Sequence, residues 1–178
     1  MGLISDASPE ELASPYYIQN KLICEAFEQF ILEKNGKVKG KFNAWSFVVY
    51  GKIPHHNKGE FKIKKSTYTS TGNLLMSSKK QSLQLESIWF AKLSESDCSD
   101  FLIEKSKWYK QSKKIDSYYS IQTKTPQHSF IKSLIKILTP IFNTKNIWKI
   151  TYKNRTLKIE TRSVKLEFEI IAQLLKLG

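Results

Sequence analysis

Residues 16–34 read YYIQNKLICEAFEQFILEK, and this stretch decides the fold because its apolar residues keep helical spacing. Seven apolar residues make up the repeat: Ile18, Leu22, Ile23, Ala26, Phe27, Phe30 and Ile31. Side chains at this spacing lie on one side of an α-helix, and such a side must be buried. We therefore predict that Phe27 and Phe30 are almost fully buried against a sheet that the following residues form.

The ends of this helix also have sequence signals. Ser14 followed by Pro15 is typical of a helix N-terminus, and Asn35-Gly36 is typical of the left-handed residue after a helix. Ahead of it, residues 8–11 read SPEE, which is a capping box with proline at the first helical position. Residues 1–14 are therefore expected to be an N-terminal extension with one short helical turn.

Strand patterns fill most of the middle of the chain. Residues 42–53, with Trp45 among their apolar side chains, predict a central strand that forms a hairpin with residues 61–64. Residues 67–81 are polar and predict an excursion between strands. Alternation returns over residues 82–93, with a slip expected at Ser87, and further strands are expected over 101–109 and 118–123.

The last third predicts a helix, a hairpin and an ambiguous end. A second amphipathic helix is expected after Thr125, with Pro140 ending or kinking it. Residues 147–152 and 156–161 predict a hairpin that sets Trp148, Ile150 and Tyr152 on one side. Residues 163–169 fit either a strand or a helix, and we favour a helix. The whole pattern predicts one α+β domain over residues 1–178, with a mostly antiparallel sheet and helices packed on one face.

The order of these segments resembles an uncharacterised bacterial family of α+β domains. The stretches that carry the resemblance are "WSFVVYGK", "DFLIEKSKW" and "IQTKTPQHSFIKSLI", and it covers most of the chain from about Cys24. In that family a meandering sheet is followed by a helix, a short hairpin and a closing helix. The resemblance implies the fold, and it brings no functional residues to particular positions here.

The cysteine content and the lack of long apolar runs indicate the compartment in which the protein is expected. The chain has 178 residues and only two cysteines, Cys24 and Cys98, too few for a disulfide framework. We expect free thiols in a reducing compartment. With no secretory leader and no apolar run of spanning length in the sequence, we expect a cytoplasmic protein, and the resemblance implies a bacterial one.

Positive charge is concentrated in one third of the chain. The formal net charge is +13, yet residues 1–33 hold six carboxylates against Lys21 alone. Residues 105–165 hold thirteen lysines and two arginines against Asp116 and Glu160. This region predicts either a surface for polyanions or a lysine-rich composition bias, and 27 lysines against 2 arginines favour the bias.

Within that region, aromatic residues alternate with cations in two segments. The candidate anion- or nucleic-acid-binding residues are Lys105, Lys107, Trp108, Tyr109, Lys110, Lys113, Lys114, Lys149, Lys153 and Arg155. Such interleaving suits stacked bases with neighbouring phosphates. The alternative is an alternating strand in which Trp108 faces the core while its lysine neighbours point to solvent, and we favour this alternative.

Catalytic and metal motifs are lacking in the sequence. His55 and His56 are adjacent, so their side chains diverge in an extended segment, and His128 suits a structural role near a helix start. Cys98 lies among acidic residues, which disfavour a thiolate. We expect no cofactor and no bound metal.

Three functions remain open from the sequence. We prefer a non-enzymatic interaction or structural module with an unknown protein partner. The alternative is sequence-nonspecific binding of nucleic acid or an anionic surface through residues 105–165, and the third is an enzyme whose residues are not recognisable. A module predicts lysines scattered over several faces, whereas a nucleic-acid binder predicts a basic surface with exposed aromatic residues.

Overall fold

The computed structural model describes residues 2–54, 60–69, 81–93, 98–106, 113–116, 118–126, 128–163, 166–169 and 172, with backbone only for 60–69, 81–84 and 113. The chain folds into two compact units. Unit 1 comprises residues 1–54, 60–87 and 162–166, and unit 2 comprises residues 55–59, 88–161 and 167–178. Helices combine with mostly antiparallel strands, which confirms the α+β class, while the single domain over residues 1–178 stays a prediction.

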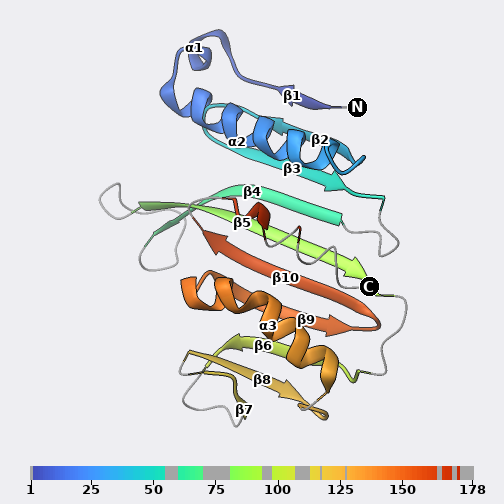
Figure 1. Cartoon of the computed structure of the whole chain (residues 1–178). Helices are drawn as coiled ribbons and strands as arrows, with labels where there is room; N and C mark the ends of the chain where they lie inside the picture. Colours follow the sequence, from blue (N-terminus) through green and yellow to red (C-terminus); the bar gives the residue numbers. More distant parts are fainter. Residues whose placement is uncertain are drawn as a thin grey trace. The chain divides into compact units, whose positions relative to one another are not determined.

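Unit 1 is a layer of strands covered by one long helix. Its elements are β1 (Leu3–Ser5), α1 (Pro9–Leu12), α2 (Pro15–Leu32), β2 (Lys37–Phe42), β3 (Phe47–Lys52), β4 (Glu60–Thr69) and the first half of β5 (Gln81–Lys92). The strands lie in the order β1-β2-β3-β4-β5. The β1–β2 pair is parallel, and the β2–β3 and β3–β4 pairs are antiparallel. Helix α2 lies across β2 and β3 (Figure 1).

The buried side of α2 is narrower than the sequence predicts. Phe27 and Ile31 are fully buried, as are the polar residue Asn20 and Cys24. The helix comes close to β3 because Gly51 has no side chain: a Cβ there would lie 2.7 Å from Ile31 and 2.9 Å from the Phe27 ring. The predicted helix with Phe27 in the core is therefore confirmed.

The predicted burial is wrong for other residues of the apolar side. Phe30 is only half-buried, and Ile18 and Leu22 have exposed fractions of 53% and 60%. The seven residues of the repeat spread over more than half of the helix circumference, whereas the strands cover only the part around Phe27. The remaining apolar side chains face away from the strands of unit 1.

A turn interrupts the predicted strand over residues 42–53. Asn43 Oδ1 accepts hydrogen bonds from the backbone N–H of Trp45 and of Ser46, each 2.9 Å long. Asn20 Nδ2 donates to the Asn43 and Ala44 carbonyls, at 2.7 and 3.1 Å, and so ties the turn to α2. Trp45 is consequently 69% exposed instead of lying within a central strand. The predicted pairing of the later residues with 61–64 is confirmed by the β3–β4 register.

The N-terminal extension has the predicted helical turn, α1. The backbone N–H of Ser8 donates to the Glu11 carboxylate at 2.7 Å, as a capping box requires. Sequence patterns did not predict β1, which is only three residues long and pairs Ile4 with Lys41. A strand this short has too few residues to show alternation.

Unit 2 is a second layer of strands with a helix on it. Its elements are the end of β5, β6 (Phe101–Lys105), β7 (Lys113–Lys114), β8 (Tyr119–Thr123), α3 (Ser129–Thr144), β9 (Ile147–Lys153) and β10 (Thr156–Ser163), whose last two residues belong to unit 1. The strand order is β5-β10-β9-β6-β8-β7. The pairs from β10 to β7 are antiparallel.

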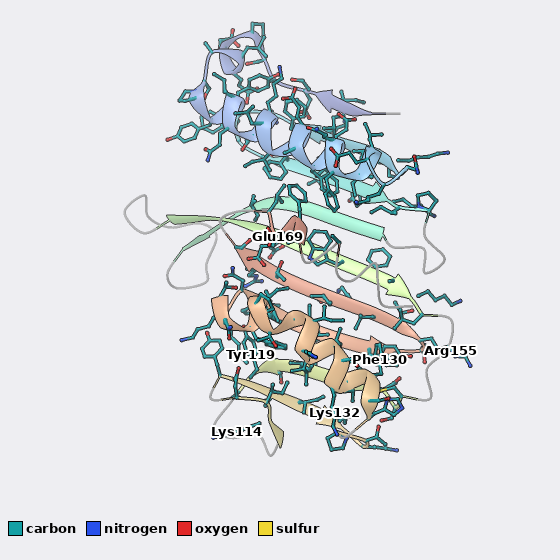
Figure 2. All side chains as sticks on the ribbon, in the orientation of Figure 1. Lys114, Tyr119, Phe130, Lys132, Arg155 and Glu169 are labelled. Carbon is teal, nitrogen blue, oxygen red and sulfur yellow. The ribbon has the colours of Figure 1, made fainter. Side chains whose placement is uncertain are left out.

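Helix α3 packs on this layer through an apolar side and a group of rings. Its buried residues are Ile131, Leu134, Leu138, Ile141 and Phe142. Tyr119 meets the Phe142 ring edge-on at 4.9 Å between centroids, and its hydroxyl donates to the Ile147 carbonyl at 3.2 Å. Figure 2 shows Tyr119 and Phe130 at opposite ends of α3. The core of unit 2 therefore runs the length of this helix.

Several boundaries in this half differ from the predictions. Helix α3 continues through Pro140 to Thr144, because Ile141 and Phe142 anchor its last turn in the core. There is no slip at Ser87, which is buried in phase with Leu85 and Trp89. Strand β6 ends at Lys105, and residues 107–109 of the predicted strand lie outside the described part of the chain.

The remaining predictions for this half are confirmed, or they concern residues outside the described part of the chain. His128 has the predicted structural role, since its Nδ1 accepts from the Phe130 N–H at 3.3 Å and caps α3. The hairpin of β9 and β10 and the strand β8 are confirmed. In the ambiguous segment, Ser163 ends β10, and residues 168, 169 and 172 are helical. Residues 70–80 of the predicted excursion and the His55-His56 pair lie outside the described residues.

Candidate nucleic-acid interface

A β-bulge turns Trp148 out of the core of unit 2. Along the β9–β10 pair, Glu160 opposes Lys149 but Thr161 opposes Ile147, so Trp148 is the extra residue. An extra residue reverses the side on which the neighbouring side chains point. Ile147 is therefore fully buried, and Trp148 is 43% exposed. The prediction that Trp148 shares a side with Ile150 and Tyr152 is wrong for this reason.

Lys105 contacts this tryptophan and links it to a tyrosine and a second lysine. Lys105 Nζ lies 5.7 Å from the centroid of the Trp148 ring and 5.3 Å from that of Tyr118. Lys145 Nζ lies 5.1 Å from the same Tyr118 centroid. We refer to Lys105, Tyr118, Lys145 and Trp148 as the Trp148 cluster. Its members come from the end of β6, the residue before β8, the end of α3 and the start of β9.

Backbone contacts hold Tyr118 and Lys145 in place. The Asp116 carboxylate accepts from the N–H groups of Tyr118 and Tyr119, both at 2.6 Å, and the Tyr118 carbonyl accepts from the Ser106 N–H at 2.7 Å. Lys145 has a φ of 58°, and its N–H donates to the Phe142 carbonyl at 3.0 Å. Lys145 thus occupies the left-handed position after a helix, where glycine is usual.

The carboxylates near the cluster are engaged with other groups. Asp116 accepts the two backbone N–H groups of the Tyr118 turn. Glu104 accepts from the Gln122 side chain at 3.3 Å, and Glu167 from the Asn146 side chain at 2.7 Å. These donors are neutral, so the carboxylates keep their charge, while the two ammonium groups of the cluster converge on the Tyr118 ring.

This arrangement can bind an anion that carries a flat group. Cation–π contacts hold the ammonium groups of Lys105 and Lys145 near one ring without neutralising their charge. The half-exposed indole of Trp148 beside Lys105 offers an apolar surface for stacking. A phosphate joined to a base combines an anion with a flat group.

Half of the candidates named from sequence have no described side chain, and their relation to this cluster stays open. Lys107, Trp108, Tyr109 and Lys110 lie outside the described residues, and only the backbone of Lys113 is described. Lys114 is exposed on β7. Lys105 is the one candidate that the described part of the chain places in the Trp148 cluster.

Lys149, Lys153 and Arg155 have other surroundings. Lys149 lies directly opposite Glu104 on β6 and Glu160 on β10, so its neighbours are carboxylates. Lys153 is the last residue of β9, about 17 Å along the strand from Trp148, and Arg155 lies in the turn that follows. Figure 2 shows Arg155 at the opposite end of unit 2 from Tyr119. The candidates whose side chains are described, Lys105, Lys114, Lys149, Lys153 and Arg155, therefore lie at several places.

Sequence reasoning missed Tyr118 and Lys145 and gave Trp148 the wrong side. Lys145 was missed because α3 continues past Pro140 to Thr144, whereas the sequence predicts that the helix ends or kinks at Pro140. No residue pattern marks the bulge, because the shift depends on how β9 pairs with β10.

Other kinds of site have less support in the described residues. No group of three or more His, Cys, Asp or Glu side chains there could hold a metal ion. Cys24 and Cys98 are buried thiols, and burial, followed by the charge of Asp100, raises the pKa of the Cys98 thiol. A raised pKa opposes a nucleophilic role. Among the described helices, none is both long and apolar enough to span a membrane.

Comparison with known proteins does not extend this picture. No family model, curated protein or solved structure matches the chain. The functional argument therefore rests on the geometry of the Trp148 cluster and on charge.

Proposed function

We propose that the chain is a non-enzymatic binding module for single-stranded nucleic acid, and that the Trp148 cluster contacts one base and the phosphates next to it. The observation that carries the proposal is the bulge that turns Trp148 outward beside Lys105, whose ammonium group also shares the Tyr118 ring with that of Lys145. An indole in a core stabilises the fold by burial, so an outward indole among cations has another use.

The chemistry of the cluster indicates binding without sequence preference. Its cations are lysines, which act as point charges toward phosphate, whereas guanine recognition usually relies on the two-pronged arginine group. Stacking tolerates every base because each base has a π-face. Affinity should therefore depend strongly on salt and weakly on base sequence.

A protein partner is the other function that the sequence left open. Exposed basic residues outside the cluster, such as Lys114, Lys153 and Arg155, lie at several places, which fits a general interaction module. An acidic peptide would use the two lysines of the cluster but would gain little from stacking on Trp148. Cytoplasmic location in a bacterium is part of this proposal, since the chain would meet RNA there and keep both thiols reduced.

The test is fluorescence anisotropy of a labelled deoxythymidine oligonucleotide of about twelve residues, titrated with the full chain at several salt concentrations. Trp148→Ala should weaken binding by about 1–3 kcal/mol through lost stacking. In the plot of log affinity against log salt, Lys105→Gln with Lys145→Gln should reduce the steepness of the slope by about 1.4. Each phosphate contact to a single strand contributes about 0.7 to this slope. Binding of the unmodified chain should be weak at about 150 mM salt.

Matched controls separate the cluster from charge and exposed rings in general. Trp45 is more exposed than Trp148 but lies in the β2–β3 turn, and Trp45→Ala should leave binding unchanged. Lys153→Gln with Arg155→Gln removes two cations at the far end of β9 and should not change the salt slope beyond a small general effect. Circular dichroism must show that each variant folds.

Two outcomes would count against the proposal. Equal losses from Trp45→Ala and Trp148→Ala would show that no particular ring is used. Tight binding of a poly-glutamate peptide, lost in the double lysine variant but kept in folded Trp148→Ala, would instead identify an acidic protein segment as the ligand.

A further inference from the structure

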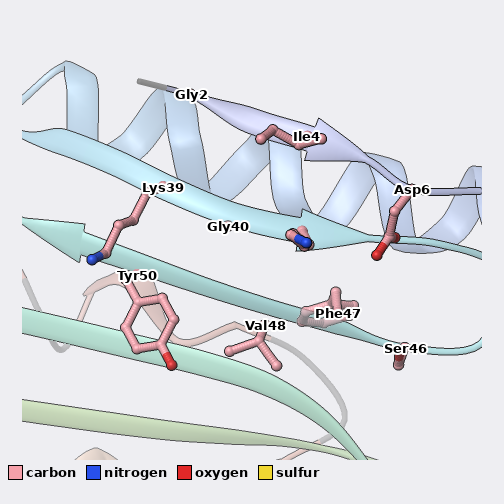
Figure 3. A pocket seen from close by; sticks show the side chains of 10 residues that line it. Gly2, Ile4, Asp6, Lys39, Gly40, Ser46, Phe47, Val48 and Tyr50 are labelled. Atoms are coloured by element: carbon pink, nitrogen blue, oxygen red, sulfur yellow. The ribbon is translucent and has the colours of Figure 1, made fainter.

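Unit 1 has an open groove on the side of its strands that faces away from α2. Ile4, Val48 and Tyr50 supply its apolar surface from β1 and β3, and Lys39 and Lys41 lie on β2 between them. The groove encloses about 690 Å³. Figure 3 shows Ile4, Lys39 and Tyr50 lining it from three neighbouring strands.

The register explains why these residues share one side. Ile4 pairs with Lys41, and Lys41 pairs with Val48, so the three lie in one row across the strands. Lys39 pairs with Tyr50 in the next row on the same side, with its Nζ 5.7 Å from the ring centroid. Residues on the other side, such as Val49, are buried beneath α2.

The groove is apolar in the middle and positive around it. Ile4 is 58% exposed, and Tyr50 is 38% exposed. Lys39 and Lys41 are exposed, and a neighbouring hollow of about 500 Å³ adds two lysines, Lys37 and Lys52, against one carboxylate, Glu28. Asp6 is the only carboxylate among the described residues that line the groove itself. A fitting partner therefore has apolar side chains flanked by carboxylates.

The outer side of α2 has this composition. Ile18, Leu22 and Leu32 are each more than half exposed. Glu25 and Glu33 lie on the same outer side of the helix and are exposed. An α-helix is about 10 Å wide, and three strands span about 10 Å from first to third, so a helix matches the width of the groove.

We propose that two copies of the chain associate through these surfaces, with the outer side of α2 from one copy seated in the β1–β3 groove of another. This contact puts the carboxylates of Glu25 and Glu33 near the lysines of the groove and covers apolar side chains on both partners. A symmetric contact between two grooves would bring lysines together, and a symmetric contact between two helices would bring glutamates together. Charge therefore selects the head-to-tail arrangement.

The test is sedimentation velocity over a wide range of concentration with two charge-reversed variants of the full chain. The groove variant is Lys39→Glu with Lys41→Glu, and the helix variant is Glu25→Lys with Glu33→Lys. All four residues are exposed, so the fold should tolerate the changes. The sedimentation coefficient of the unmodified chain should rise with concentration.

Head-to-tail association makes a specific prediction for mixtures. Each variant alone places like charges against each other, and its association should weaken by roughly tenfold or more. Mixed together, the acidic groove of one variant meets the basic helix of the other, and the unaltered surfaces also match. The equimolar mixture should therefore associate as strongly as the unmodified chain.

Three results would overturn this inference. The chain could stay monomeric at all concentrations, the variants could associate as the unmodified chain does, or mixing could fail to restore association. If the monomer instead bound vesicles rich in phosphatidylglycerol and only the groove variant lost this binding, the groove would face lipid. Leu22→Gln removes an exposed apolar contact without changing charge, and it should also weaken association. This variant keeps the inference testable if the charge-reversed variants misfold.

Discussion

Replacing Lys145 by glycine should separate the cost of the backbone from the use of the side chain. Lys145 has a φ of 58° at the end of α3, and its Nζ lies 5.1 Å from the centroid of the Tyr118 ring. Left-handed backbone costs a residue with a Cβ about 1–2 kcal/mol. Glycine avoids that cost but loses about 0.5–1 kcal/mol more conformational entropy on folding.

The matched variant is Lys145→Ala, because alanine also lacks the ammonium group but keeps the Cβ. Both variants lose the contact with Tyr118 equally, so their difference isolates the backbone. We expect Lys145→Gly to be more stable than Lys145→Ala by about 0.5–1 kcal/mol. For a chain of this length, the difference corresponds to about 1–4 °C in melting temperature.

Nucleic-acid binding should respond differently from stability. Both variants remove one phosphate contact, so each should reduce the slope of log affinity against log salt concentration by about 0.7. Thermal unfolding followed by circular dichroism and anisotropy titration of the same samples measure the two effects. The reasoning is refuted if alanine is at least as stable as glycine, or if either variant binds as the unmodified chain does.

Further predictions concern the hairpin turn, the core and the buried thiol. Arg155 has a φ of 60° beside Asn154 in the β9–β10 turn, so Arg155→Gly should stabilise the fold by about 0.5–1 kcal/mol and leave nucleic-acid binding unchanged in the same two assays. Phe27→Ala should cost about 3–5 kcal/mol in denaturant unfolding, and the half-buried Phe30 should cost clearly less when truncated; equal costs would contradict the packing of α2. Burial, followed by the charges of Glu25 and Glu28, raises the pKa of the Cys24 thiol from 9.0 to about 12. The unfolded chain then releases this proton at lower pH than the folded chain, so stability should fall as pH rises from about 9 to about 12, and Cys24→Ala should make that fall shallower.

Local patterns predicted the helices and most of the strands, because the spacing of apolar residues within one segment indicates both the type of element and its buried side. The spacing around Phe27 and the apolar side of α3 each indicate a helix without knowledge of the partner. The width of the buried side cannot be predicted in this way, because it depends on how many strands α2 covers. That is why Ile18 and Leu22 were assigned to the core and are exposed.

The candidate site was less predictable for a related reason. Lys105 was found because it stands in a run of cations and rings, but this run continues into residues outside the described part of the chain. Trp148 depends on a bulge that only the pairing with β10 reveals, and Lys145 on a helix end that tertiary packing carries past Pro140. Side-chain patterns along one segment do not contain this information.

Photo-crosslinking tests the proposed stacking on Trp148 most directly. A single-stranded oligonucleotide containing bromodeoxyuridine is mixed with the full chain at low salt and irradiated, and the cross-linked peptides are mapped by mass spectrometry. The account predicts cross-links to Trp148 and Tyr118, reduced in the Lys105→Gln with Lys145→Gln variant and competed by unlabelled strand. Cross-links confined to Trp45 or to residues of unit 1, or none at protein concentrations that saturate the anisotropy signal, would contradict it.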